Sequence, residues 1–332
     1  MTGTGRAERE TAAAIRAAAF VSGAMIAFQM AGKATQNALF LSTFPVTTLP
    51  RVIVAAAAIT IVAVVATSRM MSRFGPSRVV PALFLASAVL QLLEWALIAV
   101  RPAVAAVAVY LHYYALGALL ISGFWSLVSE RFDPRTLKRA VGPIGTSGAV
   151  GGLVGGLVAF RAADLLPVSA MLPILATLHL VCGVALIRVG APPAAERPSP
   201  VAAPPRVEAV LLSLTRVGYL RTLVAVVLAA TLAEGLLDYV FKAQARAAFG
   251  RGPELLRLFA LFYMGVNLLS FVTQTGLSRR ALERLGLART VGALPWTVAV
   301  GGAGAIAVPG LVSALLARGA EMVARNSLYS SA

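Results

Sequence analysis

Charged residues are scarce in this sequence: Asp, Glu, Lys and Arg make up 13% of its 332 residues, whereas soluble domains contain about 25%. A soluble protein of this length could not cover its surface with so few charges. Apolar residues make up 59% of the chain, the mean hydropathy is +0.84, and the apolar blocks are about 20 residues long, enough to cross a bilayer as a helix. The sequence therefore predicts an all-α, multi-pass membrane protein surrounded by the lipid bilayer.

Cysteine and histidine are also rare. The single cysteine, Cys182, excludes a disulfide framework and a cysteine-based metal site. The two histidines, His112 and His179, are too few to suggest a histidine cluster. No nucleophile and base stand at a usable spacing. We therefore expect no metal, no cofactor and no enzymatic activity.

Acidic residues are fewer than basic ones, 13 against 29, and the net charge is +16. This balance can indicate nucleic-acid binding, but in a multi-span protein arginine-rich cytoplasmic loops explain it, so we expect no nucleic-acid partner. Every second predicted connection is rich in arginine, which places the N-terminus in the cytoplasm. The N-terminal region lacks the cleavage pattern of a removed signal peptide. The Ala- and Arg-rich composition is typical of a free-living bacterium and predicts the bacterial cytoplasmic (inner) membrane.

Hydropathy predicts ten membrane-spanning helices. Their approximate limits are 12–43, 51–71, 78–99, 102–128, 139–160, 166–189, 217–248, 255–277, 289–307 and 309–331. A Pro- and Ala-rich segment, 191–215, predicts an exposed cytoplasmic linker. It separates an N-terminal six-helix bundle, 1–190, from a partial C-terminal bundle of four helices, 216–332.

Two patterns of the first half recur in the second half. Arg73, Gly75 and Arg78 form an R-x-G-x-x-R motif after the second predicted span, and the stretch that begins at Lys33 matches the stretch that begins at Lys242. The second copy of the motif consists of Arg284, Gly286 and Arg289. Because both matches run in the same direction across the membrane, they predict two parallel six-helix repeats, the plan of the major facilitator superfamily. The second repeat is truncated to four helices, so we expect a fragment of a longer protein.

Several predicted spans carry ionisable residues, which are costly in a membrane and usually face a cavity. The span 217–248 has four charged residues along one helical stripe, and the span 12–43 has three polar residues at matching positions. These residues are Glu234, Asp238, Lys242 and Arg246 in the later span, and Gln29, Lys33 and Asn37 in the earlier one. In the last span, Arg318 with Glu321 and Arg325 could bind phosphate or form a gate.

The matching positions predict a binding site for an anionic substrate in a central cavity. Lys33 and Lys242 would face it from opposite halves, assisted by Arg246, Asn37 and Gln29. Four other residues would balance charge or carry a coupled proton; these are Asp238, Glu234, Glu321 and Arg318. The alternative is that the charges only neutralise one another, as an Asp238–Lys242 pair at i and i+4 would do.

Three other features of the spans are less specific. Glu94 is isolated in its predicted span, so a protonated carboxyl that faces a neighbouring helix and a functional carboxyl are both open. The aromatic cluster His112-Tyr113-Tyr114 could line the cavity, although packing is the more common role. Glycines recur at every fourth position within 142–156, which predicts close packing against another helix.

Several short stretches share a pattern that extends over nearly the whole chain. They include ALFLS (38–42), FWSLVSERFD (124–133), DYVFK (238–242), RLF with FY (257–263) and RNSLY (325–329). Together they resemble the ATP/ADP translocase-like branch of the major facilitator superfamily. The resemblance implies the fold of that superfamily, the exchange or import of nucleotides such as ATP and ADP, and a role for Lys33. Some bacterial relatives of this type carry additional soluble regulatory domains, so the resemblance is compatible with an additional soluble domain in the full-length protein.

The two R-x-G-x-x-R loops resemble the loop between the second and third spans of major facilitator proteins, which stabilises one gating state. The usual Asp before the Arg is missing here. We therefore expect a secondary transporter that moves an anionic small molecule, such as a nucleotide, by alternating access. The alternative is a membrane regulatory or scaffold domain without transport, attached to soluble domains that lie outside this chain.

Overall fold

The computed structural model describes residues 3–189, 218–276 and 296–329. Its elements are α1 (Gly3–Thr43), η1 (Val46–Thr48), α2 (Leu49–Phe74), α3 (Pro76–Val100), α4 (Pro102–Arg131), α5 (Pro134–Leu165), η2 (Val168–Ala170), α6 (Met171–Val189), α8 (Gly218–Phe249), α9 (Pro253–Gly276), the helix Trp296–Ala307, α11 (Leu311–Ala324) and the π-helical turn η4 (Arg325–Tyr329). These three ranges contain no strand. The all-α prediction is confirmed.

Eight of the helices are long and apolar enough to cross a membrane, and they coincide with the first eight predicted spans. The ninth and tenth predicted spans correspond to shorter helices, Trp296–Ala307 and α11. Residues 289–295 of the ninth span lie outside the described ranges. The multi-pass prediction is confirmed. The largest difference in limits is at α1, which begins at Gly3 instead of residue 12, because the intervening Glu, Arg and Ala residues favour a helix.

Several helices begin at a proline, and one of them also has an aspartate cap. The helices α3, α4, α5 and α9 each begin at a proline, which fits the first turn because no hydrogen bond is needed from its nitrogen there. Before α5, the Asp133 carboxylate accepts hydrogen bonds from the backbone N–H groups of Arg135 (2.9 Å) and Thr136 (3.2 Å). Hydrogen bonds from the Thr136 side chain and backbone lower the pKa of Asp133. This cap therefore stabilises α5 at neutral pH and weakens as the pH falls through the lowered pKa.

The described residues form two compact units. Unit 1 comprises residues within 1–198 and 249–268, and unit 2 comprises residues within 199–248 and 269–332. The helix α9 contributes its first part to unit 1 and its last part to unit 2.

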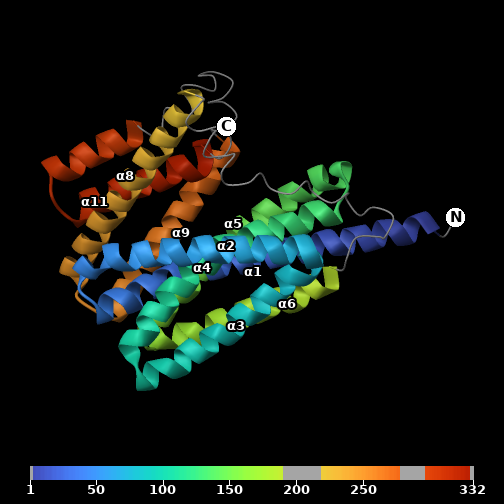
Figure 1. Cartoon of the computed structure of the whole chain (residues 1–332), viewed down its shortest axis with the longest axis horizontal. Coiled ribbons are helices and arrows are strands. Elements are labelled where there is room, and N and C mark those ends of the chain that lie inside the picture. The colour runs from blue at the N-terminus through green and yellow to red at the C-terminus, as the bar shows by residue number, and fades with distance from the viewer. Residues whose placement is uncertain (1–2, 190–217, 277–295, 330–332) are drawn as a thin grey trace. The chain divides into compact units, whose positions relative to one another are not determined.

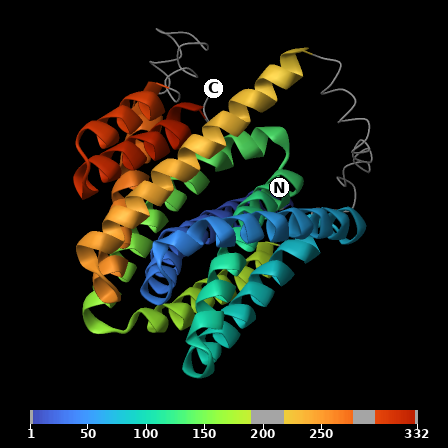
Figure 2. The same ribbon diagram turned by 60° about the vertical axis from the view of Figure 1, so that its left-hand side comes forward.

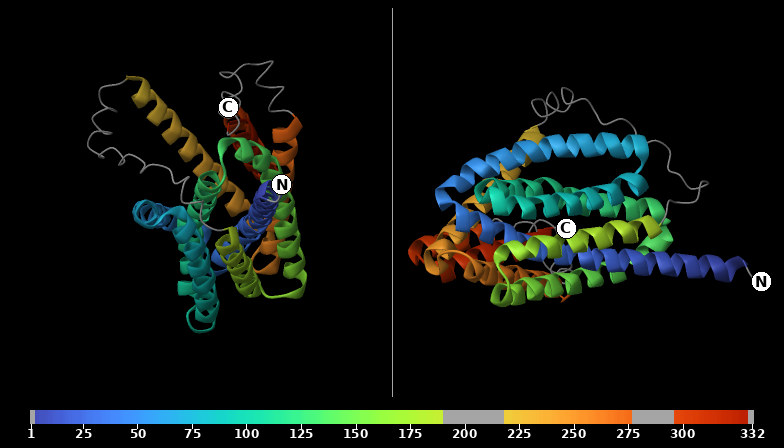
Figure 3. Two further views of the ribbon diagram at one scale, coloured as in Figure 1. Left: turned by 90° about the vertical axis from the view of Figure 1, so that its right-hand side faces the viewer. Right: turned by 90° about the horizontal axis from the view of Figure 1, so that it is seen from below.

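The helix α1 is central to unit 1 and packs against α4, α5 and α6 (Figure 1). The helix α3 packs against α4 and α6, and α2 packs against α4. The connected helices α3 and α4 lie side by side in Figure 2, and α6 follows the length of α1 in the right-hand view of Figure 3. The polar side chains of α1 are therefore surrounded by helices that can supply partners.

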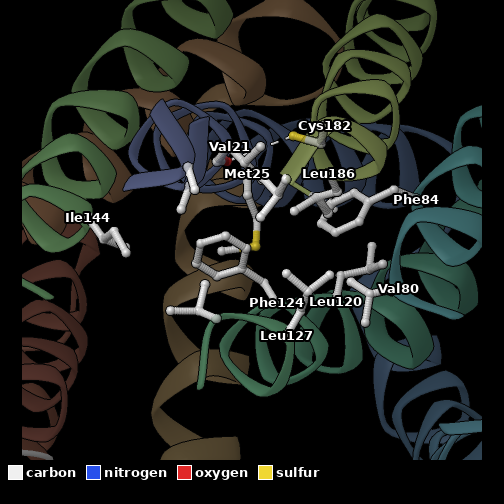
Figure 4. Close-up of a cluster of buried hydrophobic side chains, with 14 of the residues drawn as sticks. Val21, Met25, Val80, Phe84, Leu120, Phe124, Leu127, Ile144, Cys182 and Leu186 are labelled. Atoms are coloured by element: carbon white, nitrogen blue, oxygen red, sulfur yellow. Dashed lines mark hydrogen bonds between the residues drawn. The ribbon is translucent and has the colours of Figure 1, made fainter. Parts of the chain in front are cut away.

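The apolar core of unit 1 forms around Met25 of α1, whose side chain lies beside Phe124 of α4 (Figure 4). Buried residues of α3, α4 and α6 complete this cluster; among them are Val80, Phe84, Leu120, Leu127, Cys182 and Leu186. The Cys182 sulfur lies 3.8 Å from the carbonyl oxygen of Val21. The only cysteine of the chain is thus a buried packing residue.

Glycines of α5 allow α1 to approach closely. Gly151 and Gly155 lie against the backbone of Gly23 and Ala27, where an added Cβ would overlap main-chain atoms. Close approach of backbones is the usual role of glycines at this spacing in membrane helices.

Neighbouring glycines of α5 face a different helix. A Cβ on Gly152 or Gly156 would meet the side chains of Asn267 and Met264 on α9. The Asn267 side-chain amide also donates a hydrogen bond to the Ala149 carbonyl at 2.9 Å. The predicted close packing is confirmed, and it serves two partner helices because adjacent residues of a helix lie on different faces.

The helix α2 exposes apolar side chains along most of its length, including Val54, Ile61 and Val62. In water, a continuous apolar helix face of this kind would be unfavourable. In a bilayer it is the surface that acyl chains contact, which agrees with the predicted lipid surroundings.

We expect Gly155→Ala to lower the melting temperature of the detergent-solubilised protein, because the new methyl group overlaps the backbone of Ala27, which cannot rotate aside. Overpacking of this kind costs about 1–3 kcal/mol. The matched control is Gly145→Ala on the same helix, where a Cβ would meet open space. Equal melting temperatures for both variants would contradict close packing of α1 on α5.

Candidate functional site

Three polar residues of α1 were predicted to bind substrate, and all three lie within Glu8–Thr43, the part of the helix that is long and apolar enough to cross a membrane. Lys33 is about 15 Å from the end of α1 at 1.5 Å per residue, which is near the middle of a hydrocarbon core of about 30 Å. Gln29 and Asn37 are buried, and Lys33 is half-buried. Lys33 is therefore the member of this set with the greatest exposure.

Gln29 is bound to α4. Its side-chain amide donates a hydrogen bond to the Gly117 carbonyl at 2.9 Å, and its Oε1 accepts one from the Tyr113 hydroxyl at 2.6 Å. Both ends of the amide thus hold α1 against α4, so Gln29 positions the helix beside Lys33.

Asn37 and Lys33 both contact Tyr263 of α9, within unit 1. The Asn37 amide donates a hydrogen bond to the Tyr263 hydroxyl at 2.8 Å, and the Lys33 ammonium lies 5.9 Å from the centre of the Tyr263 ring. That distance is within the range of a cation–π interaction. We call these three residues the Lys33 patch. The sequence motifs included Tyr263 only as part of a resemblance, and no periodicity linked it to α1.

The charged residues of unit 2 form one network between α8 and the C-terminal helices. The Lys242 ammonium lies 2.7 Å from an Asp238 carboxylate oxygen, and Arg318 lies 3.3 Å from the other Asp238 oxygen. Arg318 also pairs with Glu234 and Glu321, and Arg325 pairs with the same two carboxylates. Three acidic and three basic side chains thus balance one another, which is how charges remain tolerable at low dielectric.

In this network, the residues predicted to bind substrate or balance charge are buried or half-buried and paired with one another. Lys242 is 2% exposed and is paired with Asp238, as the neutralisation alternative expected. Arg318 and Glu321 are also buried, and their pairing with residues of α8 shows that the charges balance between helices as well as within one. Arg246 is half-buried in the last turn of α8, where a cation is favoured by the helix dipole.

The first R-x-G-x-x-R motif forms the tight connection between α2 and α3. Gly75 has a φ of 80°, which glycine adopts without steric cost, and its N–H donates to the Met71 carbonyl at 2.9 Å. Arg73 and Arg78 are exposed on either side of this turn, and their gating role stays a prediction. The second copy of the motif lies outside the described residues; it consists of Arg284, Gly286 and Arg289.

A buried polar cluster in unit 1 contains Glu94 and both histidines. Glu94 faces a neighbouring helix, as one of the two alternatives held, because both of its carboxylate oxygens lie 3.0–3.1 Å from His112 Nδ1. The two histidines do form a cluster, because Ser87 Oγ lies 2.8 Å from His112 Nε2 and 2.7 Å from His179 Nδ1. The residues come from α3, α4 and α6, and no sequence spacing within a single helix could have indicated their meeting.

Among the described residues, no group of His, Cys, Asp and Glu side chains has a geometry that could hold a metal ion. Lys33 instead contacts an aromatic ring, Glu94 contacts His112, and the charged residues of unit 2 contact one another. Such an arrangement suits binding of a charged solute or a proton.

The fold is shared with known transporters. A D-xylose-proton symporter is 15% identical, with 95% of this chain and 80% of that chain aligned at a TM-score of 0.57. An auto inhibited POT family peptide transporter is 14% identical, with 94% and 81% aligned at a TM-score of 0.59. The chain therefore has the all-α major facilitator fold. No protein-family model matches the sequence, and a search of curated proteins finds no match.

We expect Asp238→Asn and Lys242→Gln each to destabilise the protein by up to about 3–5 kcal/mol, because each leaves buried charges of the network without compensation. The double variant should lose less than the sum of the two single losses, because it restores charge balance. Thermal unfolding in detergent measures the three variants. Arg251→Gln, at an exposed arginine, is the control. Strictly additive losses would contradict the pairing of Asp238 with Lys242.

Proposed function

We propose that the chain is a secondary transporter that moves an anionic small molecule by alternating access, with the Lys33 patch as an anion-binding element. The shared fold supports transport in general, because both structural neighbours described above are transporters by their titles. Fold similarity alone does not define a substrate. The substrate class is argued from the side chains.

The half-buried ammonium of Lys33, about 15 Å from the end of the membrane-spanning helix α1, carries this proposal. A cation at that depth costs about 2.5–3.5 kcal/mol on insertion scales, so its retention there favours a functional role. An ammonium group beside a side-chain amide and a phenol hydroxyl offers hydrogen-bond donors suited to an oxyanion. Gln29 supports this site indirectly, since its amide is used to hold α1 on α4.

A phosphate-bearing solute such as a nucleotide is the specific substrate class that we propose. Tyr263, over whose ring Lys33 lies, stacks with Phe259 and contacts Phe262 edge-on. Aromatic rings can stack on a nucleobase while a cation binds phosphate. The resemblance of the sequence to the ATP/ADP translocase-like branch supports the same class.

In this proposal, the network of unit 2 supplies cations that can change partners. An anion that binds Lys242, with Arg246 one turn away, would displace Asp238 from the ammonium. Asp238 and Glu234 would then remain balanced by Arg318, which already contacts both carboxylates. The exchange would keep charges paired throughout, which limits its cost in a membrane.

We further propose that the protein resides in a bacterial cytoplasmic membrane with its N-terminus in the cytoplasm. The arginines around Gly75 and the other arginine-rich connections support this orientation. We retain the division into a six-helix bundle, 1–190, a linker, 191–215, and a four-helix portion, 216–332, because the repeated motifs support it.

We expect Lys33→Ala to weaken anion binding about 10- to 100-fold, because a charge-assisted hydrogen bond contributes about 1.5–3 kcal/mol. The measurement is a thermal-shift titration of the solubilised protein with ADP, ATP, sugar phosphates and dicarboxylates, followed by uptake of the stabilising compound into proteoliposomes. A ligand at 100 times its Kd should stabilise the folded protein by about 2.7 kcal/mol.

Lys138→Ala is the matched control, because Lys138 is one of only three lysines and lies exposed near the start of α5. Lys242→Ala tests the second cation separately. Equal binding and uptake by the parent protein and Lys33→Ala would refute the Lys33 patch as the anion site. Absence of flux for every anion with the parent protein would instead favour a membrane domain without transport.

A further inference from the structure

A continuous hydrogen-bonded chain crosses three helices of unit 1. It runs from Glu94 on α3 to His112 on α4, then to Ser87 on α3 and finally to His179 on α6. All four side chains are at most 9% exposed. Such a chain of alternating donors and acceptors can move a proton without moving its heavy atoms, because each member can receive one proton and release another.

The single hydroxyl proton of Ser87 restricts the proton positions in this chain. Ser87 lies within hydrogen-bond distance of one nitrogen on each histidine, but it can donate to only one of them. In the first arrangement, Ser87 donates to His112 Nε2 and accepts from the Nδ1–H of His179. His112 Nδ1–H then donates to an ionised Glu94 carboxylate. This arrangement has a net charge of −1.

The second arrangement contains one more proton. A proton that binds Nε2 of His179 releases the Nδ1 proton to Ser87, and Ser87 passes its own proton to His112 Nε2. His112 then either remains protonated beside the Glu94 carboxylate or passes its Nδ1 proton to that carboxylate. Ser87 now donates to His179 Nδ1, toward which the Gln91 amide nitrogen also points at 3.4 Å. The net charge is zero, every hydrogen bond of the chain is retained, and the two hydrogen bonds of Ser87 run in the opposite direction.

Burial of the chain favours uptake of one proton, and His179 is the member that can hold it. Nε2 of His179 is buried and has no hydrogen-bond partner among the described residues, so it is the vacant acceptor at the end of the chain. Phe28 stacks on this imidazole with ring centres 3.5 Å apart, and Phe84 contacts its edge at 5.1 Å. The negative charge of the first arrangement lies on Glu94, which is 3% exposed. A buried, uncompensated charge is costly, and protonation of the chain removes it.

Other titratable groups on the neighbouring helices contact different partners. On α6, the Cys182 sulfur points to the Val21 carbonyl. On α1, Lys33 lies over Tyr263, and the arginines of α2 are exposed. On α4, the Tyr113 hydroxyl is bound to Gln29 and the ring of Tyr110 stacks on Tyr114. Within the described residues, the two histidines are thus the ionisable groups that directly contact Ser87 or Glu94.

We propose that Glu94, His112, Ser87 and His179 form a proton-binding relay that takes up one proton at His179 Nε2 and delivers it to the His112–Glu94 pair. Proton uptake by this relay is independent of any transported solute. Coupling of that proton to solute movement rests on the proposed transport function. The structural link for such coupling is Phe28, which stacks on both His179 and Tyr113, and Tyr113 binds Gln29, one turn from Lys33.

The chain contains only two histidines, so ¹⁵N-histidine labelling reports on the relay alone. We expect the imidazole ¹⁵N signals of both histidines in the detergent-solubilised protein to change in a single shared pH step, because one proton rearranges both rings. Glu94→Gln should abolish this step, because a glutamine cannot ionise and the arrangement with a net charge of −1 is lost. Ser87→Ala should uncouple the two histidines, so that His179 no longer follows His112.

Ser126→Ala is the matched control, because Ser126 is a half-buried serine of α4 whose hydroxyl donates to the Ser122 carbonyl of its own helix. It should retain the shared step. Unchanged signals across the pH range in which the protein stays folded would overturn the relay, and so would separate steps for the two histidines in the parent protein. Either result would leave a static hydrogen-bonded cluster that holds three helices together.

A second measurement separates this inference from the proposed function. Uptake of ADP into proteoliposomes should depend on an imposed pH gradient in the parent protein and in Ser126→Ala, and that dependence should be lost in Glu94→Gln. A shared histidine step without any ADP flux would support the relay and overturn its coupling to ADP. If ADP flux in the parent protein does not depend on the pH gradient, the coupling of the relay to ADP is overturned and the transport proposal remains intact.

Discussion

The cost of placing a polar or charged group in an apolar medium governs the arrangement of this protein. Each ionisable side chain within a membrane-spanning helix requires a partner that compensates its charge or its hydrogen-bonding capacity. Because one helix rarely offers enough partners, the compensation joins helices. The same contacts therefore hold the bundle together and define where chemistry can occur.

The two units meet this constraint in different ways. Unit 2 uses a balanced set of three acidic and three basic side chains, in which Arg318 joins carboxylates of α8 and α11. Unit 1 relies mainly on hydrogen bonds, such as those of Gln29 to α4 and of Asn37 to α9. Charge compensation favours partner exchange among ions, whereas hydrogen-bonded chains allow a proton to move.

Close helix packing makes these contacts possible. Hydrogen bonds between side chains of different helices require backbones that approach within a few side-chain lengths, and the glycines of α5 permit this on two faces at once. With α5 close to both α1 and α9, Tyr263 comes within reach of Lys33 and Asn37. The glycine ridge thus positions the Lys33 patch without contributing a functional group to it.

The amino-acid sequence by itself determined the fold class and the positions of the first eight membrane-spanning helices, because burial of backbone polar groups in lipid requires long apolar helices. It also determined that Lys33 lies deep in the first span and that Asp238 and Lys242 share a helix face, because i to i+4 spacing is a local property. Only the tertiary structure decided that Glu94 meets His112, that Ser87 joins both histidines, and that Tyr263 lies beside Lys33. These contacts link residues on different helices, and they depend on helix rotation and packing, which no local periodicity encodes.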